Sequence, residues 1–129
     1  MVDEVAWPIE LIPDSDNVFM RAHRAHFREG ELQPGVFRQH GDGMSVDWDK
    51  YSTAQATRSR GAIPTDNAVI AARVGHIRGL SGLDVHHKPE QSNQAHSNVI
   101  GLPSRTTPEL VEVRVKLLRI SKVVLPLDL

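Results

Sequence analysis

A short apolar run in the middle of the chain, residues 68–74, limits the folds that this sequence can adopt. The run reads Ala-Val-Ile-Ala-Ala-Arg-Val and is short and apolar, which favours a buried β-strand. Burying a Val or Ile side chain stabilises a fold by about 1.5–3 kcal/mol. We therefore expect Val69, Ile70, Ala72 and Val74 to be largely buried in a central strand.

Alternation of apolar and polar residues predicts a second strand over 18–23. One face of this strand would carry residues 18, 20 and 22, and the other would present Arg21 and His23. A helix that begins at a cap on Asn17 is the alternative, because the run is too short for its periodicity to decide.

Two more alternating segments, 36–40 and 44–48, flank the connection Gly41-Asp42-Gly43. A glycine-rich connection of this length between alternating segments is typical of a β-hairpin, which we expect here. Residues 83–87 predict a further short strand.

Helix signals occur at two places before the C-terminal segment. Ser52, with Gln55 three residues later, resembles a capping box and predicts a helix over 53–60 that stops at Gly61. The segment 75–79, which begins and ends with glycine, predicts one helical turn.

The C-terminal segment fits two structures. Thr107-Pro108-Glu109 is typical of a helix start. Apolar residues recur behind it at helical spacing: Leu110, Val113, Leu117, Ile120 and Val124. Alternation over 111–117 also fits a strand. We favour the helix because of the cap signal, and the strand stays open as the alternative.

The whole chain predicts one globular domain over residues 1–129. Its length is typical of a single domain, and 40% hydrophobic and 24% charged residues are ordinary for a folded protein. The predicted class is α+β, with a small mixed or antiparallel sheet of four to six strands and two or three helices. An apolar N-terminal arm, 1–13, is expected to pack on this domain, and 88–98 is expected to be a polar loop.

Composition excludes several classes of site and partner. The chain has no cysteine, so it can form neither disulfides nor thiolate metal sites. The formal net charge is −1, whereas a protein that coats duplex DNA usually carries a strong basic excess, so we expect no duplex DNA partner. The sequence shows neither a signal peptide nor a membrane-spanning stretch, which predicts a soluble cytoplasmic protein with no membrane partner.

Histidine is unusually frequent, with seven residues in the chain. One group lies on the first predicted strand and just after it, and we expect Arg21 and His23 from it to face a ligand. A second group consists of His86 and His87 at the end of a predicted strand and His96 at the far end of the polar loop. Histidine titrates near neutral pH and can transfer protons or bind metals.

These groups predict a site for an anionic ligand. We expect His23, His86 and His96 to be candidate catalytic residues, in acid–base pairs. Ligand-binding candidates are two arginines, which suit bidentate phosphate contacts, with two further polar residues from the predicted hairpin and strand end: Arg21, Arg38, Ser45 and His87. In particular, Arg21, His23, His86 and His96 are expected to converge on one pocket.

Two further interpretations have weaker motifs. Three histidines can hold catalytic zinc, but no HExxH motif is present, and we assign no metal-ligating residue. Arg21 on an early strand, followed by Ser45 on a later one, resembles ADP-ribosyltransferase-type NAD-binding domains. The resemblance covers two short segments. Those domains also use a late glutamate, for which only Glu109 and Glu112 are available, in a context that does not match.

Three function classes follow from the sequence. The first is a binder or enzyme for a phosphate-bearing ligand, such as a nucleotide or RNA. The second is a non-catalytic interaction or accessory module with a protein partner, for which a flat apolar patch around Trp7 or Trp48 would be expected. The third is a histidine-ligated metal-dependent enzyme. The sequence leaves the cofactor unknown.

Overall fold

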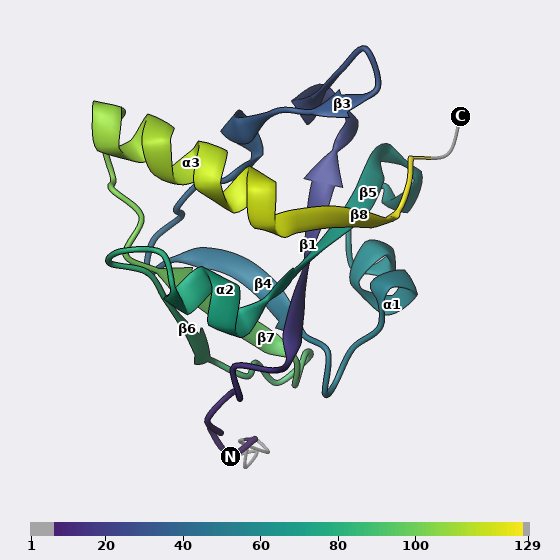
Figure 1. The fold of residues 1–129 in the computed structure, drawn as a ribbon. Coiled ribbons are helices and arrows are strands. Elements are labelled where there is room, and N and C mark those ends of the chain that lie inside the picture. Colours follow the sequence, from purple (N-terminus) through teal and green to yellow (C-terminus); the bar gives the residue numbers. More distant parts are fainter. Residues whose placement is uncertain (1–6, 128–129) are drawn as a thin grey trace.

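The computed structural model describes residues 7–127, which form an antiparallel six-stranded sheet with helices (Figure 1). The strand order is β6-β7-β4-β1-β5-β8. The bounds of these strands are β1 Asn17–His23, β4 Met44–Trp48, β5 Asn67–Arg73, β6 Asp84–His87, β7 His96–Ile100 and β8 Ser121–Leu125. A separate small hairpin consists of β2 (Phe27–Arg28) and β3 (Glu31–Leu32). The predicted α+β class is confirmed.

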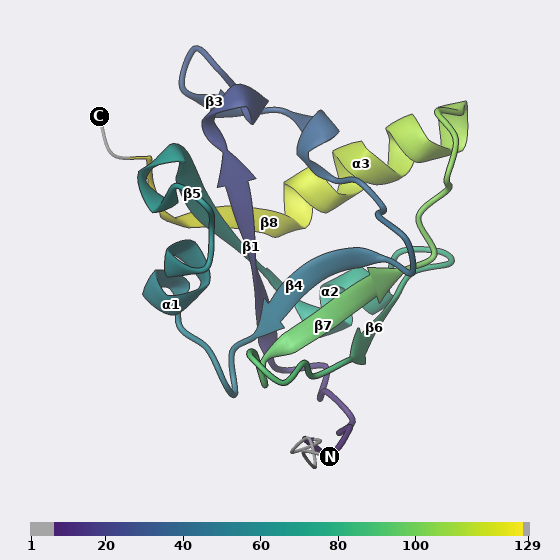
Figure 2. The same ribbon diagram turned by 180° about the vertical axis from the view of Figure 1, so that it is seen from behind.

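Three α-helices accompany the sheet in the described part of the chain: α1 (Ala54–Ser59), α2 (Val74–Arg78) and α3 (Pro108–Ile120). Figures 1 and 2 show α2 and α3 on one face of the sheet. Single 3-10 turns are η1 (Arg24–His26), η2 (Pro34–Val36) and η3 (Pro64–Asp66).

The two faces of the sheet differ in chemistry because side chains alternate along each strand. The face toward α2 and α3 is apolar, and on β1 it carries Val18, Met20 and Ala22, all buried. The opposite face is polar and carries Arg21 and His23 on β1 with Ser45 and Asp47 on β4, as the pairing of Phe19 with Asp47 requires. The strand prediction for 18–23 is therefore confirmed, and the helix from Asn17 is excluded.

The apolar run in mid-chain is mostly β5. Val69 and Ile70 are buried between β1 and β8, and Ala72 is half-buried. Val74 is also buried, but it begins α2 and does not belong to the strand. The predicted helical turn at 75–79 and the strand at 83–87 are confirmed within one residue at each end.

The predicted hairpin of 36–40 with 44–48 is wrong for its first arm. Residues 34–36 form η2, and the only pairing near the turn is an isolated bridge between His40 and Gly43. Packing explains the difference. Val36 and Phe37 are buried in the core, and the carbonyl of Phe37 accepts a hydrogen bond from Arg114 Nε on α3 at 2.8 Å. This segment therefore packs against α3, and β4 pairs with β1 and β7.

Helix α1 confirms the predicted helix, but its cap is not Ser52. Thr53 is the N-cap, and its Oγ1 accepts a hydrogen bond from the backbone N–H of Ala56 at 3.0 Å. The hydroxyl of Ser52 is engaged instead with Thr57 Oγ1, at 3.0 Å. Gly61 follows the C-cap residue Arg60, where the prediction placed the end of the helix.

The C-terminal segment contains both structures that its sequence allowed. Thr107 caps α3 and the helix runs to Ile120, so the predicted helix start is confirmed. The helix then ends at Ser121, whose backbone is extended, and β8 pairs with β5. The helical stripe therefore stops at Ile120 and does not include Val124.

The N-terminal arm and the polar loop are both part of the described fold. Within the described part of the arm, Ile12 is buried, whereas Ile9 and Leu11 are 76% and 94% exposed. Residues 1–6 of the arm lie outside the described residues. In the loop, an isolated bridge joins Glu90 to Asn93, and the last residues of 88–98 belong to β7, which begins at His96.

Candidate functional site

The polar face of the sheet forms one wall of a cleft of about 770 Å³. Side chains from β1 and β4 form its floor, and the 24–40 segment and the turn before β7 contribute its rims. The volume is in the range of small-molecule sites. Figure 2 shows the molecule from the side on which β4 and β7 lie in front of α2.

The cleft brings together most of the residues that the sequence singled out. Arg21, His23, Arg38, Ser45 and His96 all line it. Arg21 and His23 lie on one face of β1, as expected from their spacing, and His96 opens β7. Histidines from both sequence groups therefore share one cleft.

His86 does not join them. It lies on the edge strand β6, where its Nε2 is 3.2 Å from Asp84 Oδ2. Its side chain lines a separate hollow against the arm residues Ile9 and Leu11. The expected convergence of His86 with Arg21, His23 and His96 is therefore wrong.

His87 points to the apolar face and is only 2% exposed. Its Nδ1 accepts a hydrogen bond from the backbone N–H of Glu10 at 3.0 Å, so its Nε2 carries the proton and donates to the carbonyl of Gln94 at 2.7 Å. The ring also packs against Trp48 and Tyr51. Both ring nitrogens are thus occupied by backbone partners, and His87 lies outside the cleft lining.

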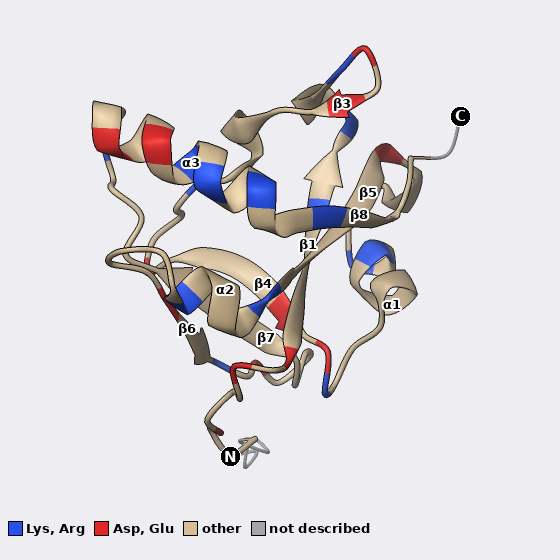
Figure 3. Ribbon diagram, in the orientation of Figure 1, with Lys and Arg blue, Asp and Glu red and all other residues tan. Residues whose placement is uncertain are grey.

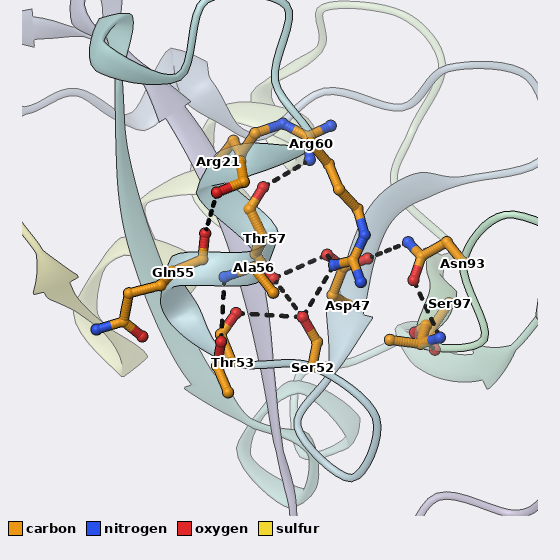
Figure 4. A network of polar contacts seen from close by, with 12 residues as sticks. Arg21, Asp47, Ser52, Thr53, Gln55, Ala56, Thr57, Arg60, Asn93 and Ser97 are labelled. Atoms are coloured by element: carbon orange, nitrogen blue, oxygen red, sulfur yellow. Dashed lines mark hydrogen bonds and ion pairs between the residues drawn. The ribbon is translucent and has the colours of Figure 1, made fainter.

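A buried carboxylate organises one side of the cleft (Figure 4). Asp47 is 5% exposed and accepts hydrogen bonds on both oxygens. Its Oδ2 receives Thr57 Oγ1 at 2.8 Å and an Arg60 guanidinium nitrogen at 2.7 Å, and its Oδ1 receives Asn93 Nδ2 at 2.8 Å. This network ties α1 and the turn before β7 to β4, and its central charge is neutralised by Arg60.

Two arginines of the cleft lack such a partner. Arg21 donates to the backbone carbonyl of Thr57 at 3.0 Å, and Arg38 donates through Nε to the carbonyl of Gly35 at 3.2 Å. Within residues 7–127, neither guanidinium forms an ion pair with a carboxylate. Their charges are therefore available to an anion.

His26 reports the electrostatic character of this side of the cleft. Its pKa lies below its usual value of 6.5, first because burial disfavours the charged ring and then because the positive charges of Arg38 and His23 repel it. The positive charge of Arg38 therefore acts on the ring of His26, in addition to the larger effect of burial. Both ring nitrogens of His23 already have contacts. Its Nδ1 accepts a hydrogen bond from the backbone N–H of Ala25 at 3.0 Å, and its Nε2 lies 3.9 Å from Asp66 Oδ2.

A second contact on the polar face joins Ser45 and His96. Ser45 Oγ lies 3.3 Å from His96 Nε2, and the Nδ1 of the same ring lies 2.8 Å from the carbonyl oxygen of Lys88. Ser45 is exposed and His96 half-buried. Both nitrogens of the ring are therefore within hydrogen-bond distance of an oxygen.

The predicted site residues did not include several residues of the cleft, among them His26, His40, Thr57, Arg60 and Asn93. Asp47 is separated from Arg60 by 13 positions and from Asn93 by 46, so no local sequence motif predicts these contacts. Of these residues, His26 could have been predicted, because it lies three residues after His23 in the segment rich in arginine and histidine.

The alternative sites find little support in the geometry. In the part of the chain that the structure describes, no group of three or more His, Cys, Asp or Glu side chains is arranged to hold a metal ion. Arg21 and Ser45 do share the cleft. Glu109 and Glu112 are exposed on α3 and do not line the cleft. Figure 3 shows acidic positions in red on the first turns of this helix.

Comparisons with known proteins leave the function to be argued from this geometry. No protein-family model matches the chain, and neither does any curated protein or solved structure. Over residues 7–127, every helix is too short or too polar to cross a membrane.

Proposed function

We propose that the cleft binds a phosphate-bearing small molecule, with a nucleotide as the ligand class that its size favours. The observation that carries this proposal is the pair Arg21 and Arg38, which line the cleft without a carboxylate partner among the described residues. Guanidinium groups suit phosphate because they form two parallel charge-assisted hydrogen bonds. A volume of about 770 Å³ accommodates a small ligand.

Histidines add donors beside the arginines. His26 and His40 line the same cleft as Arg38, and His26 holds its proton weakly while the cleft is empty of anions. A phosphate group would offset the repulsion from Arg38 and His23, so the imidazolium form of His26 would be favoured in the complex. Binding would then weaken as pH rises through the titration range of His26.

The proposal is tested by calorimetric titration with adenosine 5′-monophosphate, with adenosine as the control that lacks phosphate. We expect the monophosphate to bind and adenosine to bind at least about tenfold more weakly, since one charge-assisted hydrogen bond contributes about 1.5–3 kcal/mol. Arg21→Gln and Arg38→Gln should each weaken the monophosphate about tenfold or more. Arg119→Gln, an exposed arginine of α3 outside the cleft lining, is the matched control and should have no effect.

Equal binding of the two ligands, or equal losses in all three arginine variants, would contradict the proposal. Tighter binding of a short single-stranded RNA than of the monophosphate would replace the nucleotide by RNA as the ligand class.

The interaction-module alternative has a different location. Trp48 cannot contribute to a surface patch, because it is 1% exposed and donates its indole N–H to Asp16 at 2.8 Å. Trp7, Ile9 and Leu11 are exposed on the N-terminal arm, and a protein partner would bind there under this alternative. Ile9→Ser combined with Leu11→Ser would abolish capture of such a partner and leave nucleotide binding in the cleft unchanged, because both side chains are exposed.

A further inference from the structure

The contact between Ser45 and His96 has the geometry of an activated hydroxyl. The Nδ1 of His96 lies 2.8 Å from the carbonyl oxygen of Lys88, which can only accept a hydrogen bond. In the neutral ring Nδ1 therefore carries the proton, and Nε2 has a free lone pair. Ser45 Oγ lies 3.3 Å from that nitrogen, so the serine hydroxyl is the donor.

Strand pairing holds the two side chains in place. Ser45 is opposite Asn98 and Asp47 is opposite His96, so Ser45 and His96 are diagonal neighbours on the polar face of β4 and β7. The backbone also positions the ring, because Lys88 N–H donates to the carbonyl of His96 at 3.0 Å. The hydroxyl of Ser45 has no other hydrogen-bond partner in the described part of the chain, and Ser45 lines the cleft.

We propose that Ser45 is a nucleophile activated by His96, and that it accepts a phosphoryl group from a phosphate ester held in the cleft. A serine, a histidine that accepts its proton and a third group that orients the histidine are the parts that nucleophilic catalysis requires. Here the carbonyl of Lys88 is the orienting group. The choice of a phosphate ester rests on the proposed function, because Arg21 and Arg38 are the groups in the cleft that would bind the phosphate oxygens.

The reaction has two balanced steps. Ser45 Oγ forms a bond to phosphorus while the bond from phosphorus to the leaving oxygen breaks, and the serine proton passes to His96 Nε2. The leaving oxygen lies in line on the opposite side of phosphorus, so it takes its proton from solvent water and departs as an alcohol, while the imidazolium stays beside Ser45. In the second step water attacks the phosphoserine from that opposite side and gives its proton to solvent. The imidazolium of His96 returns its proton to Ser45 Oγ as phosphate leaves. No oxidant or reductant is consumed.

Diisopropyl fluorophosphate tests the nucleophile without depending on anion binding, because the reagent is uncharged. Attack by Ser45 would form the O–P bond and release fluoride, and the adduct is located by peptide mass spectrometry. We expect Ser45 to be labelled in the folded protein, with labelling abolished in Ser45→Ala. Ser92→Ala is the matched control, because Ser92 also lines the cleft but has no imidazole partner within residues 7–127.

The role of His96 has its own readout. His96→Ala should slow the labelling of Ser45 by roughly 10²-fold or more, the size of a general-base contribution. Imidazole added to this variant should restore part of the rate, provided that the variant melts like the parent protein. If the variant does not fold, His96→Gln replaces it, since the amide can keep the bond to the Lys88 carbonyl while lacking a basic nitrogen.

Absence of an adduct on Ser45, or an adduct that forms at the same rate without His96, would overturn the proposal. A slow variant that imidazole does not accelerate would also overturn it, because His96 would then act only on structure. A different result would contradict the proposed function, namely monophosphate binding that does not depend on Arg21 and Arg38.

Discussion

Arg60 and Arg38 line the same cleft in opposite electrostatic surroundings. Arg60 lies 2.7 Å from Asp47, a buried carboxylate that also receives Thr57 and Asn93. Among the described residues, the guanidinium of Arg38 forms one hydrogen bond, to the carbonyl of Gly35. Burial and then the charge of Arg38 lower the pKa of His26. One side of the cleft thus satisfies its charges internally, as a structural network does. The other side keeps positive charge that the described fold does not use.

The difference shows which arginines of a cleft indicate a ligand and which stabilise the fold. A buried charge must be paired because its desolvation is costly, so the Arg60 side contributes to folding and carries little information about a ligand. An exposed cation can stay without an ion pair at small cost, so the fold does not require a carboxylate partner for Arg21 or Arg38. Their presence beside a polar cavity is the part of the structure that points to an anionic ligand.

The largest effect is expected from removing the centre of the paired side. Asp47→Ala would leave Arg60, the Thr57 hydroxyl and the Asn93 amide without their common acceptor. We expect the free energy of unfolding to fall by about 3 kcal/mol, as when one partner of a buried pair is lost. Urea denaturation measures this, with Asp42→Ala as the control, because Asp42 is exposed and, among the described residues, forms an ion pair only with Lys88. Equal losses in the two variants would show that the network is not structural.

Substituting each arginine in turn compares the two sides of the cleft directly, with a smaller expected effect. Arg60→Gln should lower the free energy of unfolding by about 2 kcal/mol, because Asp47 would lose its charged donor. Arg38→Gln should change it by less than about 0.5 kcal/mol, as surface substitutions do. Both are measured by the same urea denaturation. Arg38→Gln costing as much as Arg60→Gln would mean that Arg38 is structural too.

Much of the fold was predictable because its signals are local. Strand β1 and most of β5 follow from alternation and from an apolar run, and Thr107-Pro108 marks the start of α3. The end of α3 was not predictable, since 111–117 satisfies both periodicities and only pairing with β5 makes 121–125 a strand. The arm of the predicted hairpin failed because Phe37 packs into the core, which is a tertiary effect.

The sequence predicted several residues of the site, but it did not predict which residues contact one another. Arg21, His23 and His96 were singled out from composition and strand position, and they line one cleft. His86 was grouped with them through its sequence neighbours, but its edge strand places it against the arm. The contact of Ser45 with His96 crosses 51 positions, so it depends on the register of β4 with β7.

The pKa of His26 in the free protein and with pyrophosphate tests the central claim most directly. Histidine signals followed by nuclear magnetic resonance across a pH titration give this pKa, with His76, exposed on α2, as the internal control. In the free protein the pKa of His26 should lie below 6.5 because of burial, Arg38 and His23.

Pyrophosphate in the cleft would stabilise the imidazolium, so the pKa of His26 should rise on binding. Protons are then taken up with the ligand, and affinity should fall as pH rises between the free and bound pKa values. The ring signals of His76 should keep their positions when pyrophosphate is added at constant pH. A pKa of His26 that stays the same when pyrophosphate is added at saturation would contradict the claim that the unpaired side of the cleft holds an anion.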